Sequence, residues 1–491
     1  MSPVDDVALH ARLQPERLAA HDLTSGERWS YRALDRAVDR QAGALLARGL
    51  QTGDRVAVLA KNRVECVVLH LACARAGLIL VPLNWRLSPA ELATLVADAE
   101  PALLLGDACL DAAGLDGVAM DAFANEASSA DPMPPRVIDR ARPSLILYTS
   151  GTSGLPKGVL LSEANLAETA INFGQLGRLS YDSVVLCDAP MFHVIGLVTN
   201  IRPTLMHGGA ILVSDGFAPA RTLARLADPS LGVTGYFCVP QMAAALRAEP
   251  SFDSRALRRL VAVFTGGAPH PEASIRAWLA DGVPIVDGYG MTEAGTVLGM
   301  PVDPRLLERH AGSVGVPPPR VEVRIVDRDG AVLPPGQAGE LQLRGPNVTS
   351  GYWRRPEETA AAFTVDGWFR SGDIARADPE GFVRIVDRAK DMFISGGENV
   401  FPAEIEAILA DHPGIAECAV VGVRDERWGE VGHLAVVPRG AAIEPAAVLA
   451  LLEAKLARYK LPKHVSLVDG LPRNGAGKVL KAELRRRLAD E

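Results

Sequence analysis

The chain has 491 residues, of which 48% are hydrophobic and 22% are charged, a composition typical of globular proteins. Its formal net charge of −8 and its lack of long basic runs exclude a general nucleic-acid binder, whose affinity depends on a basic face. At ~100–200 residues per domain, the length predicts two or more domains.

Cysteine usage and the apolar segments bear on the compartment of the protein. The six cysteines show no close metal-ligand pairing and mostly lie in apolar runs, as expected of small buried side chains in a reducing compartment. The N-terminal residues include early acids and lack an apolar signal core. The most apolar stretch, residues 67–83, is interrupted by His70 and Arg75 and falls short of the ~20 residues of a membrane span. We therefore expect a soluble cytoplasmic protein without an integral membrane segment.

The first part of the chain alternates helix-like and strand-like segments. Residues 31–50 have apolar side chains at helical spacing, residues 55–60 form a short buried-strand run, and residues 66–77 predict the next helix. A turn-rich linker at residues 131–135 precedes another predicted strand at residues 144–150. This alternation favours an α/β fold in which helices cover a parallel sheet.

Two later segments, residues 260–271 and 284–295, share one pattern. In each, an apolar run stops at a polar loop that contains glycine. Because open α/β sheets hold ligands at such strand ends, we expect the binding site to lie there.

The pattern changes near Val321. Short hairpin strands separated by Gly, Pro and Asp turns are predicted at residues 321–330, 339–345 and 381–388. These segments predict a small β element within the larger domain.

A tail of about 100 residues, the size of a small domain, follows this β element. Its pattern predicts a helix, two strands, a second helix over residues 445–459 and a closing helix. We place the boundary at residues 387–391, which predicts an N-terminal domain over 1–387 and a C-terminal α+β domain over 388–491.

One loop carries an unusual density of hydrogen-bond donors. Residues 148–159 contain four Ser and Thr residues, three glycines and one lysine, between a buried strand and a predicted helix. Glycine lets the backbone approach an anion closely, and the N–H groups and hydroxyls donate to phosphate oxygens. Lys157 adds a mobile positive charge suited to a polyphosphate. The loop is not a Walker A motif, because only two residues separate Gly154 from Lys157 and no Ser or Thr follows the lysine.

This segment, TSGTSGLPKG, closely resembles the phosphate loop of the adenylate-forming superfamily, which includes acyl-CoA synthetases, peptide-synthetase adenylation domains and beetle luciferases. Five more segments follow in the order of that family. They resemble its adenine-side loop (264–269), nucleotide and magnesium loop (287–293), ribose motif (371–374), hinge (387–391) and catalytic-lysine loop (475–478). The resemblance covers nearly the whole chain. It implies a large N-terminal domain of layered α/β subdomains and a mobile C-terminal domain.

The resemblance implies a nucleotide site. The residues it assigns to ATP and AMP are Thr149, Ser150, Gly151, Thr152, Ser153, Gly154, Lys157, Gly267, Ala268, Pro269, Asp287, Gly288, Tyr289, Gly290, Met291, Thr292, Asp373, Arg388 and Lys478. Within this set, Tyr289 is expected to stack on adenine. Asp373 is expected to accept the ribose hydroxyls, and Arg388 to donate to the same sugar.

The resemblance also implies the chemistry. Adenylation joins a carboxylate to the α-phosphorus of ATP, so the main task is to neutralise charge as it develops. We expect Glu293 and Thr149 to ligate Mg²⁺. Lys478 is expected to reach both the substrate carboxylate and the α-phosphate. The remaining expected catalytic residues are Thr152, Lys157 and His193.

Residues 190–197, PMFHVIGL, resemble the acid-binding segment of acyl- and aryl-CoA ligases. Amino-acid-activating relatives typically carry an aspartate where this chain has His193, so an α-amino acid would lack its counter-ion. His193 gates the acid, contacts its carboxylate, or is simply a packed strand-end histidine. The other expected acyl-binding residues are Val194, Gly196, Gly267 and Gly288. The two last glycines lead us to expect a roomy tunnel for a medium-chain, long-chain or bulky (aryl or polycyclic) acid.

The coenzyme A site is also implied by resemblance. Arg86 is the expected phosphate donor, and Trp428 is either a stacking partner or a structural residue. Gly396, Gly397 and Glu398 resemble the loop that lines the thiol tunnel. Lys390 matches the hinge about which the C-terminal domain rotates between half-reactions.

These features predict an AMP-forming acid–thiol ligase. It would use ATP and Mg²⁺ to convert a carboxylic acid to an acyl-adenylate, release pyrophosphate, and transfer the acyl group to coenzyme A. Two alternatives stay open: an acyl-AMP ligase that loads a separate carrier protein, and a catalytically inactive nucleotide-binding scaffold. The sequence identifies neither the acid nor the oligomeric state.

Overall fold

The computed structural model describes residues 5–134, 137–149, 156–268, 270–388, 390–395, 398–410, 412–425, 427–440, 443–453, 455–473 and 479–489. Contacts divide the chain into two compact units. The first comprises Met1–Val323 and Leu343–Phe369, and the second comprises Arg324–Gln342 and Arg370–Glu491. Among the described helices, none combines the length and apolar character needed to cross a membrane.

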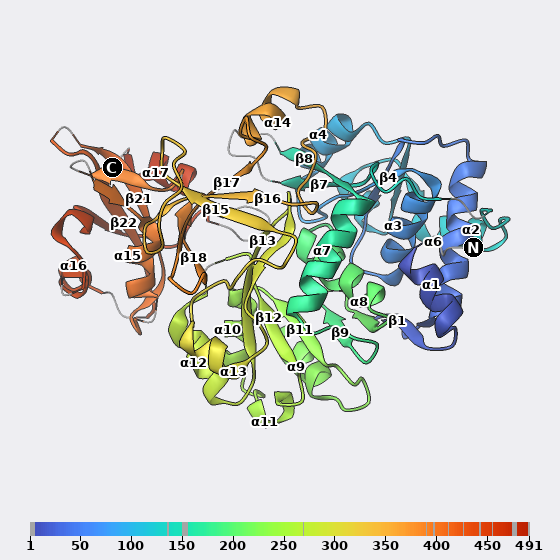
Figure 1. Cartoon of the computed structure of the whole chain (residues 1–491), viewed down its shortest axis with the longest axis horizontal. Helices are drawn as coiled ribbons and strands as arrows, with labels where there is room; N and C mark the ends of the chain where they lie inside the picture. Colours follow the sequence, from blue (N-terminus) through green and yellow to red (C-terminus); the bar gives the residue numbers. More distant parts are fainter. Residues whose placement is uncertain are drawn as a thin grey trace. The chain divides into compact units, whose positions relative to one another are not determined.

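The larger sheet of the first unit has eight described strands in the order β14-β13-β12-β11-β9-β10-β1-β2 (Figure 1). Their bounds are β1 (Leu18–Asp22), β2 (Arg28–Ser30), β9 (Val184–Cys187), β10 (Ala210–Val213), β11 (Gly235–Cys238), β12 (Ala262–Thr265), β13 (Ile285–Met291) and β14 (Gly295–Gly299). The strands from β13 to β1 run parallel, whereas β14 and β2 pair antiparallel at the two edges. The predicted α/β class is therefore confirmed.

A second sheet in this unit has six described strands in the order β6-β5-β3-β4-β7-β8. Their bounds are β3 (Arg55–Leu59), β4 (Ile79–Pro82), β5 (Leu103–Gly106), β6 (Val118–Ala119), β7 (Pro143–Thr149) and β8 (Lys157–Ser162). All neighbours run parallel except β7 and β8, which form an antiparallel pair. The helix predicted directly after the phosphate loop is therefore wrong, because the chain returns as the edge strand β8 first.

Helices cover these sheets. Their bounds are α1 (Asp6–Leu13), α2 (Tyr31–Ala47), α3 (Val64–Ala76), α4 (Pro89–Ala99), α5 (Cys109–Ala113), α6 (Met120–Ser128), α7 (Glu163–Leu176), the π-helix η1 (Ile195–Ile201), α8 (Arg202–Met206), α9 (Pro219–Ala227), α10 (Pro240–Ala248), α11 (Ser254–Leu257), α12 (Glu272–Ala280), α13 (Pro304–Arg309) and α14 (Pro356–Ala362). Helix α3 is buried on almost every side, which explains its apolar sequence. Helix α7 begins where the Ser162 hydroxyl accepts the Asn165 N–H, a capping box that fixes the turn after β8.

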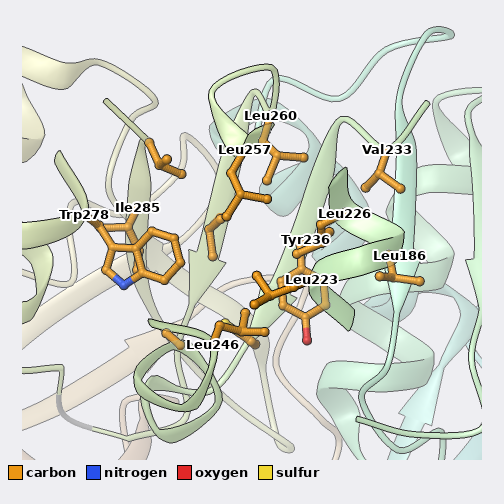
Figure 2. Packing of buried hydrophobic residues seen from close by; sticks show 14 of the residues in the cluster. Leu186, Leu223, Leu226, Val233, Tyr236, Leu246, Leu257, Leu260, Trp278 and Ile285 are labelled. Carbon is orange, nitrogen blue, oxygen red and sulfur yellow. The ribbon is translucent and has the colours of Figure 1, made fainter. Parts of the chain in front are cut away.

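Figure 2 shows the core on one face of the larger sheet, where leucines surround Tyr236 and Trp278. Tyr236 comes from β11, Ile285 from β13 and Trp278 from α12, and all three are fully buried. Burial of such large apolar side chains is the main stabilising contribution to this face. It fixes β11, β12 and β13 as a rigid support for the loops at their carboxyl ends.

The second unit contains most of a four-stranded sheet, of order β15-β16-β17-β18, and a five-stranded sheet, of order β20-β19-β22-β21 with β23 beside β22. The strand bounds are β15 (Glu322–Val326), β16 (Gly339–Arg344), β17 (Phe369–Ala377), β18 (Val383–Arg388), β19 (Phe393–Ser395), β20 (Glu398–Val400), β21 (Ile415–Asp425), β22 (Gly429–Pro438) and β23 (His464–Leu467). The helices are α15 (Pro402–Leu409), α16 (Pro445–Glu453), the 3₁₀ turn η2 (Arg458–Lys460) and α17 (Lys481–Ala489). The helix predicted over residues 445–459 thus ends six residues early, at Glu453.

All six cysteines are free thiols, and four of them are buried: Cys66, Cys73, Cys187 and Cys238. Burial raises the pKa of Cys66 and of Cys187 to about 12. At neutral pH these thiols are therefore protonated, which agrees with the prediction that they pack as small apolar side chains.

Candidate active site

Three of the predicted binding segments meet at one edge of the larger sheet. The acid-binding segment follows β9, the Gly266–Ala268 loop follows β12, and Asp287 lies within β13. Since β9, β11, β12 and β13 are parallel neighbours, their carboxyl ends lie together (Figure 1). This edge is where an open α/β sheet binds ligands.

The predicted phosphate loop connects β7 to β8. Thr149 is paired with Lys157 across the two strands, and the Thr149 hydroxyl donates a hydrogen bond of 3.4 Å to the Lys157 carbonyl. The loop residues between these strands that were assigned to phosphate binding lie outside the described residues: Ser150, Gly151, Thr152, Ser153 and Gly154. The strand pair fixes both ends of this loop, because an antiparallel ladder sets their register.

A tyrosine that the sequence did not single out connects the predicted metal ligand to the loop lysine. The Tyr352 hydroxyl donates to Glu293 Oε1 at 3.1 Å, and the Lys157 Nζ lies 5.2 Å from the centroid of the Tyr352 ring. Burial and the Glu293 carboxylate raise the pKa of Tyr352 above its usual value, so it remains a donor. Thr149, Lys157, Tyr352 and Glu293 thus form one continuous group, which we call the phosphate-side group.

The donor chemistry of this group fits magnesium. Glu293 and Thr149 supply hard oxygen atoms, and Mg²⁺ is commonly held by one or two carboxylates together with substrate phosphates and water. Among the residues that the structure describes, no cluster of three or more His, Cys, Asp or Glu side chains could hold a metal ion by itself. A protein-only metal cage is therefore not present in that part of the chain.

The acid-binding segment leads into the π-helix η1. An added Cβ at Gly196 would lie 2.1 Å from the Pro190 carbonyl oxygen, so only glycine permits this tight entry. His193 precedes the helix and is exposed to solvent, so it is not a packed histidine of the core. The surrounding protein nevertheless lowers the pKa of His193 through desolvation, so its imidazole is neutral at pH 7. Val194 is buried.

Gly267 faces an apolar wall. Its φ of +82° favours glycine, and a Cβ built there would lie 3.3 Å from Ile195 Cδ1 and 3.9 Å from Val239 Cγ1. Ile195 and Val239 were not identified from the sequence. By contrast, a Cβ at Gly288 would point at the Leu298 carbonyl oxygen, 3.1 Å away in β14. Gly288 therefore allows close strand packing, and only Gly267 faces the wall that Ile195 and Val239 form.

Aromatic side chains lie next to the loop that follows β12. Phe173 from α7 lies 5.0 Å from Phe264 of β12 and 5.9 Å from Phe237 of β11, measured between ring centroids. A Cβ at Gly266 would lie 3.4 Å from the Phe237 ring. The loop after β12 thus rests directly on a buried aromatic cluster.

The nucleotide strand β13 extends further than the sequence predicted. We expected the strand to stop at the polar loop that begins with Asp287, but β13 continues to Met291 by pairing with β14. Asp287 is buried, and its Oδ1 accepts hydrogen bonds from Thr265 Oγ1 and Gly288 N, each of 3.1 Å. Tyr289, two residues on, is half-buried, as are Met291, Thr292 and Ala268, whereas Gly290 is exposed. Pro269 lies outside the described residues.

The two predicted ribose residues are neighbours in the second unit. Asp373 of β17 pairs in register with Arg388 of β18, and Arg388 Nε lies 2.6 Å from Asp373 Oδ1. The Ser371 hydroxyl accepts the Asp373 N–H at 3.0 Å. Asp387 accepts the Arg388 and Ala403 N–H groups, which joins β18 to the start of α15. The strand pairing therefore holds a carboxylate and a guanidinium side by side.

The predicted coenzyme A residues fall in both units. In the first, the Arg86 guanidinium lies 5.0 Å from the Trp85 ring centroid and 5.8 Å from that of Phe192, and Lys61 Nζ lies 5.7 Å from Trp85. In the second, Trp428 is 40% exposed, with Arg427 and Lys463 over its ring.

The remaining predicted site residues can be placed only in part. Lys390 is an exposed turn residue in the second unit. Gly396, Gly397 and Lys478 lie outside the described residues, as does the side chain of Glu398.

Comparison with known proteins addresses the identity of the chain. The model of the AMP-binding enzyme family matches residues 7–353, and the model of the AMP-binding enzyme C-terminal domain matches residues 404–478. The chain belongs to the AMP-binding enzyme family. The predicted resemblance to the adenylate-forming superfamily is confirmed, and the relatives described next place the chain in its acyl-CoA synthetase branch.

Several relatives align over nearly the whole chain. A feruloyl-CoA synthase from an Amycolatopsis species is 41% identical, covering 97% of each protein. An indoleacetate–CoA ligase from Aromatoleum aromaticum is 40% identical, covering 98% of this chain and 97% of that one. A fatty acid–[acyl-carrier-protein] ligase, ScoC from Streptomyces coeruleorubidus, is 35% identical over 99% of this chain and 96% of its own length. The expectation of an AMP-forming acyl-CoA synthetase is therefore confirmed.

Solved structures agree with the fold. ATP-bound MatB from Rhodopseudomonas palustris superposes with a TM-score of 0.89 at 36% identity and 99% coverage of both chains. O-succinylbenzoate coenzyme A synthetase, MenE from Bacillus subtilis, in complex with ATP and magnesium, gives a TM-score of 0.88 at 29% identity and 98% coverage of both chains. The predicted arrangement of a large N-terminal and a smaller C-terminal domain is confirmed.

Proposed function

We propose that the protein activates an aromatic carboxylic acid with ATP and Mg²⁺ and transfers the resulting acyl group to coenzyme A. The observation that carries this proposal is a single sheet edge. The apolar wall of Ile195 and Val239 faces Gly267 there, in the loop between β12 and the neighbouring nucleotide strand β13. Similarity to a feruloyl-CoA synthase and an indoleacetate–CoA ligase supports an aryl substrate.

In the first half-reaction, a carboxylate oxygen attacks the α-phosphorus of ATP and pyrophosphate leaves. The apolar wall and Gly267 hold the ring of the acid, and neutral His193 lies next to the wall as a hydrogen-bond partner for its carboxylate. Lys157 and the loop N–H groups bind the phosphates, and Lys478 offsets the charge that develops between the carboxylate and the α-phosphate. No general base is required, because the acid reacts as its carboxylate.

Glu293 and Thr149 would hold the magnesium ion, whose chemistry here is to neutralise phosphate charge. Tyr352 orients Glu293 through its 3.1 Å hydrogen bond. Tyr289 stacks on the adenine, while Asp373 and Arg388 bind the ribose hydroxyls.

In the second half-reaction, the coenzyme A sulfur attacks the acyl carbonyl carbon, the proton of the thiol is lost, and AMP leaves. Arg86 binds a phosphate of coenzyme A, and Lys61, which also lies near the Trp85 ring, supports it with a second positive charge. Trp428 offers an exposed ring to the nucleotide of coenzyme A. The resemblance assigns Gly396, Gly397 and Glu398 to the binding of the coenzyme A thiol. A rotation of residues 388–491 about Lys390 switches the enzyme from the first half-reaction to the second.

Acid-dependent exchange of labelled pyrophosphate into ATP tests this proposal, followed by addition of coenzyme A and detection of the thioester. The panel compares hydroxycinnamic and arylacetic acids with medium- and long-chain fatty acids, acetate and malonate. We expect the highest kcat/KM with an aryl acid. A fatty acid as the best substrate would overturn the aryl assignment, and acetate or malonate would overturn the expected roomy site as well.

Carrier-protein loading is the second candidate function, because ScoC is similar over nearly its full length. The same experiment separates the two. Exchange followed by a coenzyme A thioester supports the first proposal, whereas exchange without a thioester, but with transfer to an acyl-carrier protein supplied in trans, supports the second. No exchange with any acid, together with ATP binding, would support the inactive scaffold instead.

Replacing Glu293 by glutamine tests the metal site. Glu293→Gln keeps the shape of the side chain but removes its charge, so we expect pyrophosphate exchange to fall about 100-fold and the half-saturating Mg²⁺ concentration to rise. Tyr352→Phe is the matched variant, since it removes only the hydrogen bond to Glu293 and should have a smaller effect of the same sign. An unchanged Mg²⁺ dependence in Glu293→Gln would contradict the assignment.

A further inference from the structure

The last turn of helix α4 carries a carboxylate that contacts two separate segments near the phosphate-side group. Asp98 is the second-last residue of α4, and its side chain is 19% exposed. Its Oδ2 accepts the Tyr148 hydroxyl at 2.6 Å, and its Oδ1 accepts Arg355 Nη2, also at 2.6 Å. The proposed function uses none of these three residues.

Tyr148 connects Asp98 to the phosphate loop. It directly precedes Thr149 at the end of β7, where the loop begins, and it is paired with Gly158 of β8. Burial and the Asp98 carboxylate raise the pKa of Tyr148 above its usual value, so its hydroxyl stays protonated and donates at neutral pH. The start of the loop is therefore held by a side-chain hydrogen bond as well as by the strand ladder.

Arg355 connects Asp98 to the segment that holds Glu293. Three residues before Arg355, the Tyr352 hydroxyl donates to the Glu293 carboxylate. Between them, Trp353 donates its indole Nε1–H to the Asp98 backbone carbonyl at 3.0 Å. The side chain and the main chain of Asp98 thus hold residues 352–355 at two points.

The two segments that Asp98 joins are closely packed on either side of Gly158. A Cβ built at Gly158 would lie 3.4 Å from Tyr148 Cε1 and 3.3 Å from Trp353 Cβ. The Trp353 N–H also donates to the Gly158 carbonyl at 2.7 Å. Because closely packed interiors transmit strain, a shift of Tyr148 or Trp353 would also move β8.

The end of α4 is itself fixed to the neighbouring sheet. Arg55 of β3 donates from Nε to the Ala99 carbonyl at 3.0 Å and from Nη2 to the Glu100 carbonyl at 2.7 Å. The last carbonyls of a helix have no partner within it, so these contacts satisfy groups that need one. Asp98 therefore lies on a firm support rather than on a free helix end.

We infer that Asp98 is a positioning residue that fixes the separation of the two expected magnesium ligands, Thr149 and Glu293. This inference deepens the proposed function and rests on its assignment of Mg²⁺ to these ligands. Asp98 acts through Tyr148 on one side and through the segment of Tyr352 on the other. Two donors on two oxygens require two acceptors, which only a carboxylate provides. Asp98 should thus affect magnesium-dependent binding of ATP and pyrophosphate exchange, and not the thioester step.

Asp98→Ala tests the inference, because it leaves Tyr148 and Arg355 without their shared acceptor. We expect pyrophosphate exchange to fall about tenfold and the half-saturating Mg²⁺ concentration to rise about tenfold, as is typical when the partner of a metal ligand's support is lost. Conversion of a supplied acyl-adenylate to the thioester should stay near the parent rate. Tyr148→Phe removes one of the two hydrogen bonds and keeps the ring, so it should show a smaller effect of the same sign. It replaces Asp98→Ala if that variant does not fold.

Direct binding provides a readout that does not depend on turnover. Calorimetric titration with ATP, in Mg²⁺ and in EDTA, measures how much affinity the metal adds. This gain should be about tenfold smaller in Asp98→Ala than in the parent, whereas the affinity in EDTA should be equal in both. An equal loss of affinity with and without Mg²⁺ would mean that Asp98 only stabilises the fold, and would overturn the inference.

Glu100→Gln is the matched control. Glu100 follows α4 and forms an ion pair of 2.6 Å with Arg354, with side chains that are 56% and 47% exposed. This variant therefore breaks a neighbouring contact between the same two segments without removing a partner of Tyr148, and it should leave the Mg²⁺ dependence unchanged.

Two results would contradict the role of Asp98 while leaving the proposed function intact. One is an Mg²⁺ dependence of Asp98→Ala equal to that of Glu100→Gln. The other is an equal loss of exchange and of thioester formation in Asp98→Ala. If no acid supports exchange in the parent, the proposed function fails instead, and the calorimetric comparison still decides the inference.

Discussion

Lys478→Ala is expected to lower acid-dependent pyrophosphate exchange by at least about 100-fold, because it removes the charge that meets both the carboxylate and the α-phosphate as they react. Conversion of a supplied acyl-adenylate to the coenzyme A thioester should stay near the parent rate, since that step no longer involves pyrophosphate release. The two half-reactions, assayed separately, provide the measurement.

Lys390→Pro is expected to show the opposite pattern. Proline fixes φ near −65° and removes the N–H, so it restricts the rotation that the thioester step requires. Exchange should persist and thioester formation should fall. Lys455→Ala, which changes an exposed lysine of the same unit, should affect neither step. Equal loss of both steps in Lys478→Ala and Lys390→Pro would contradict domain alternation.

Arg202→Met is expected to cost about 3–5 kcal/mol of unfolding free energy, because it leaves the buried carboxylate of Glu163 without its partner. Arg202 Nη2 lies 2.7 Å from Glu163 Oε2, and the two side chains are only 5% and 7% exposed. Ser144 donates to Glu163 Oε1 at 2.7 Å, and His70 Nε2 lies 3.2 Å from Arg202 Nη1. Burial lowers the pKa of His70 to about 3, so this histidine is a neutral acceptor.

The ion pair between Arg202 and Glu163 should also make the free energy of unfolding depend on pH. Although burial by itself would raise the pKa of Glu163, the Arg202 charge lowers it overall. The stabilisation is therefore present above the ordinary Glu pKa and is lost as the pH falls through the lowered value. Arg202→Met should reduce this acid sensitivity.

A double replacement separates the ion pair from simple packing. Arg202→Met combined with Glu163→Leu removes both buried charges, so it should destabilise less than Arg202→Met alone in urea and thermal unfolding. Arg344→Met is the control, because its partner Glu322 is exposed and the pair is solvated; no measurable change is expected. A double variant as unstable as the sum of the two single variants would contradict this account.

Hydrophobic periodicity predicted the local elements closely where one face or the whole segment is buried. The helix expected at residues 31–50 is α2, and the strand expected at 55–60 is β3. The pairing between distant segments could not be obtained in this way. β1 joins the larger sheet beside β10, about 190 residues later, and nothing near Leu18–Asp22 signals that partner. β8 was missed because glycine and proline dominate the loop before it.

The residues of the site divide in the same way into those that the sequence could predict and those that it could not. Motifs identified segments such as 287–293, because each carries several chemically distinctive residues together. Tyr352, Val239 and Thr265 are single ordinary residues whose neighbours in sequence carry no such pattern. They reach the site through the fold: Tyr352 by its bond to Glu293, Val239 by facing Gly267, and Thr265 by its register with Asp287. Only a structure could reveal them.

The burial of the cysteines has a consequence for an enzyme of this kind. An acyl-adenylate acylates any thiolate that it meets, and two of the buried cysteines, Cys187 and Cys238, end the strands β9 and β11 that form the site edge. Burial keeps their pKa far above neutrality, and the partly buried Cys109 and Cys418 have pKa values raised to about 11 and about 12. The acyl-adenylate can therefore react with the thiol of coenzyme A, while the cysteines of the protein stay protonated and unreactive. This difference protects the enzyme from self-acylation.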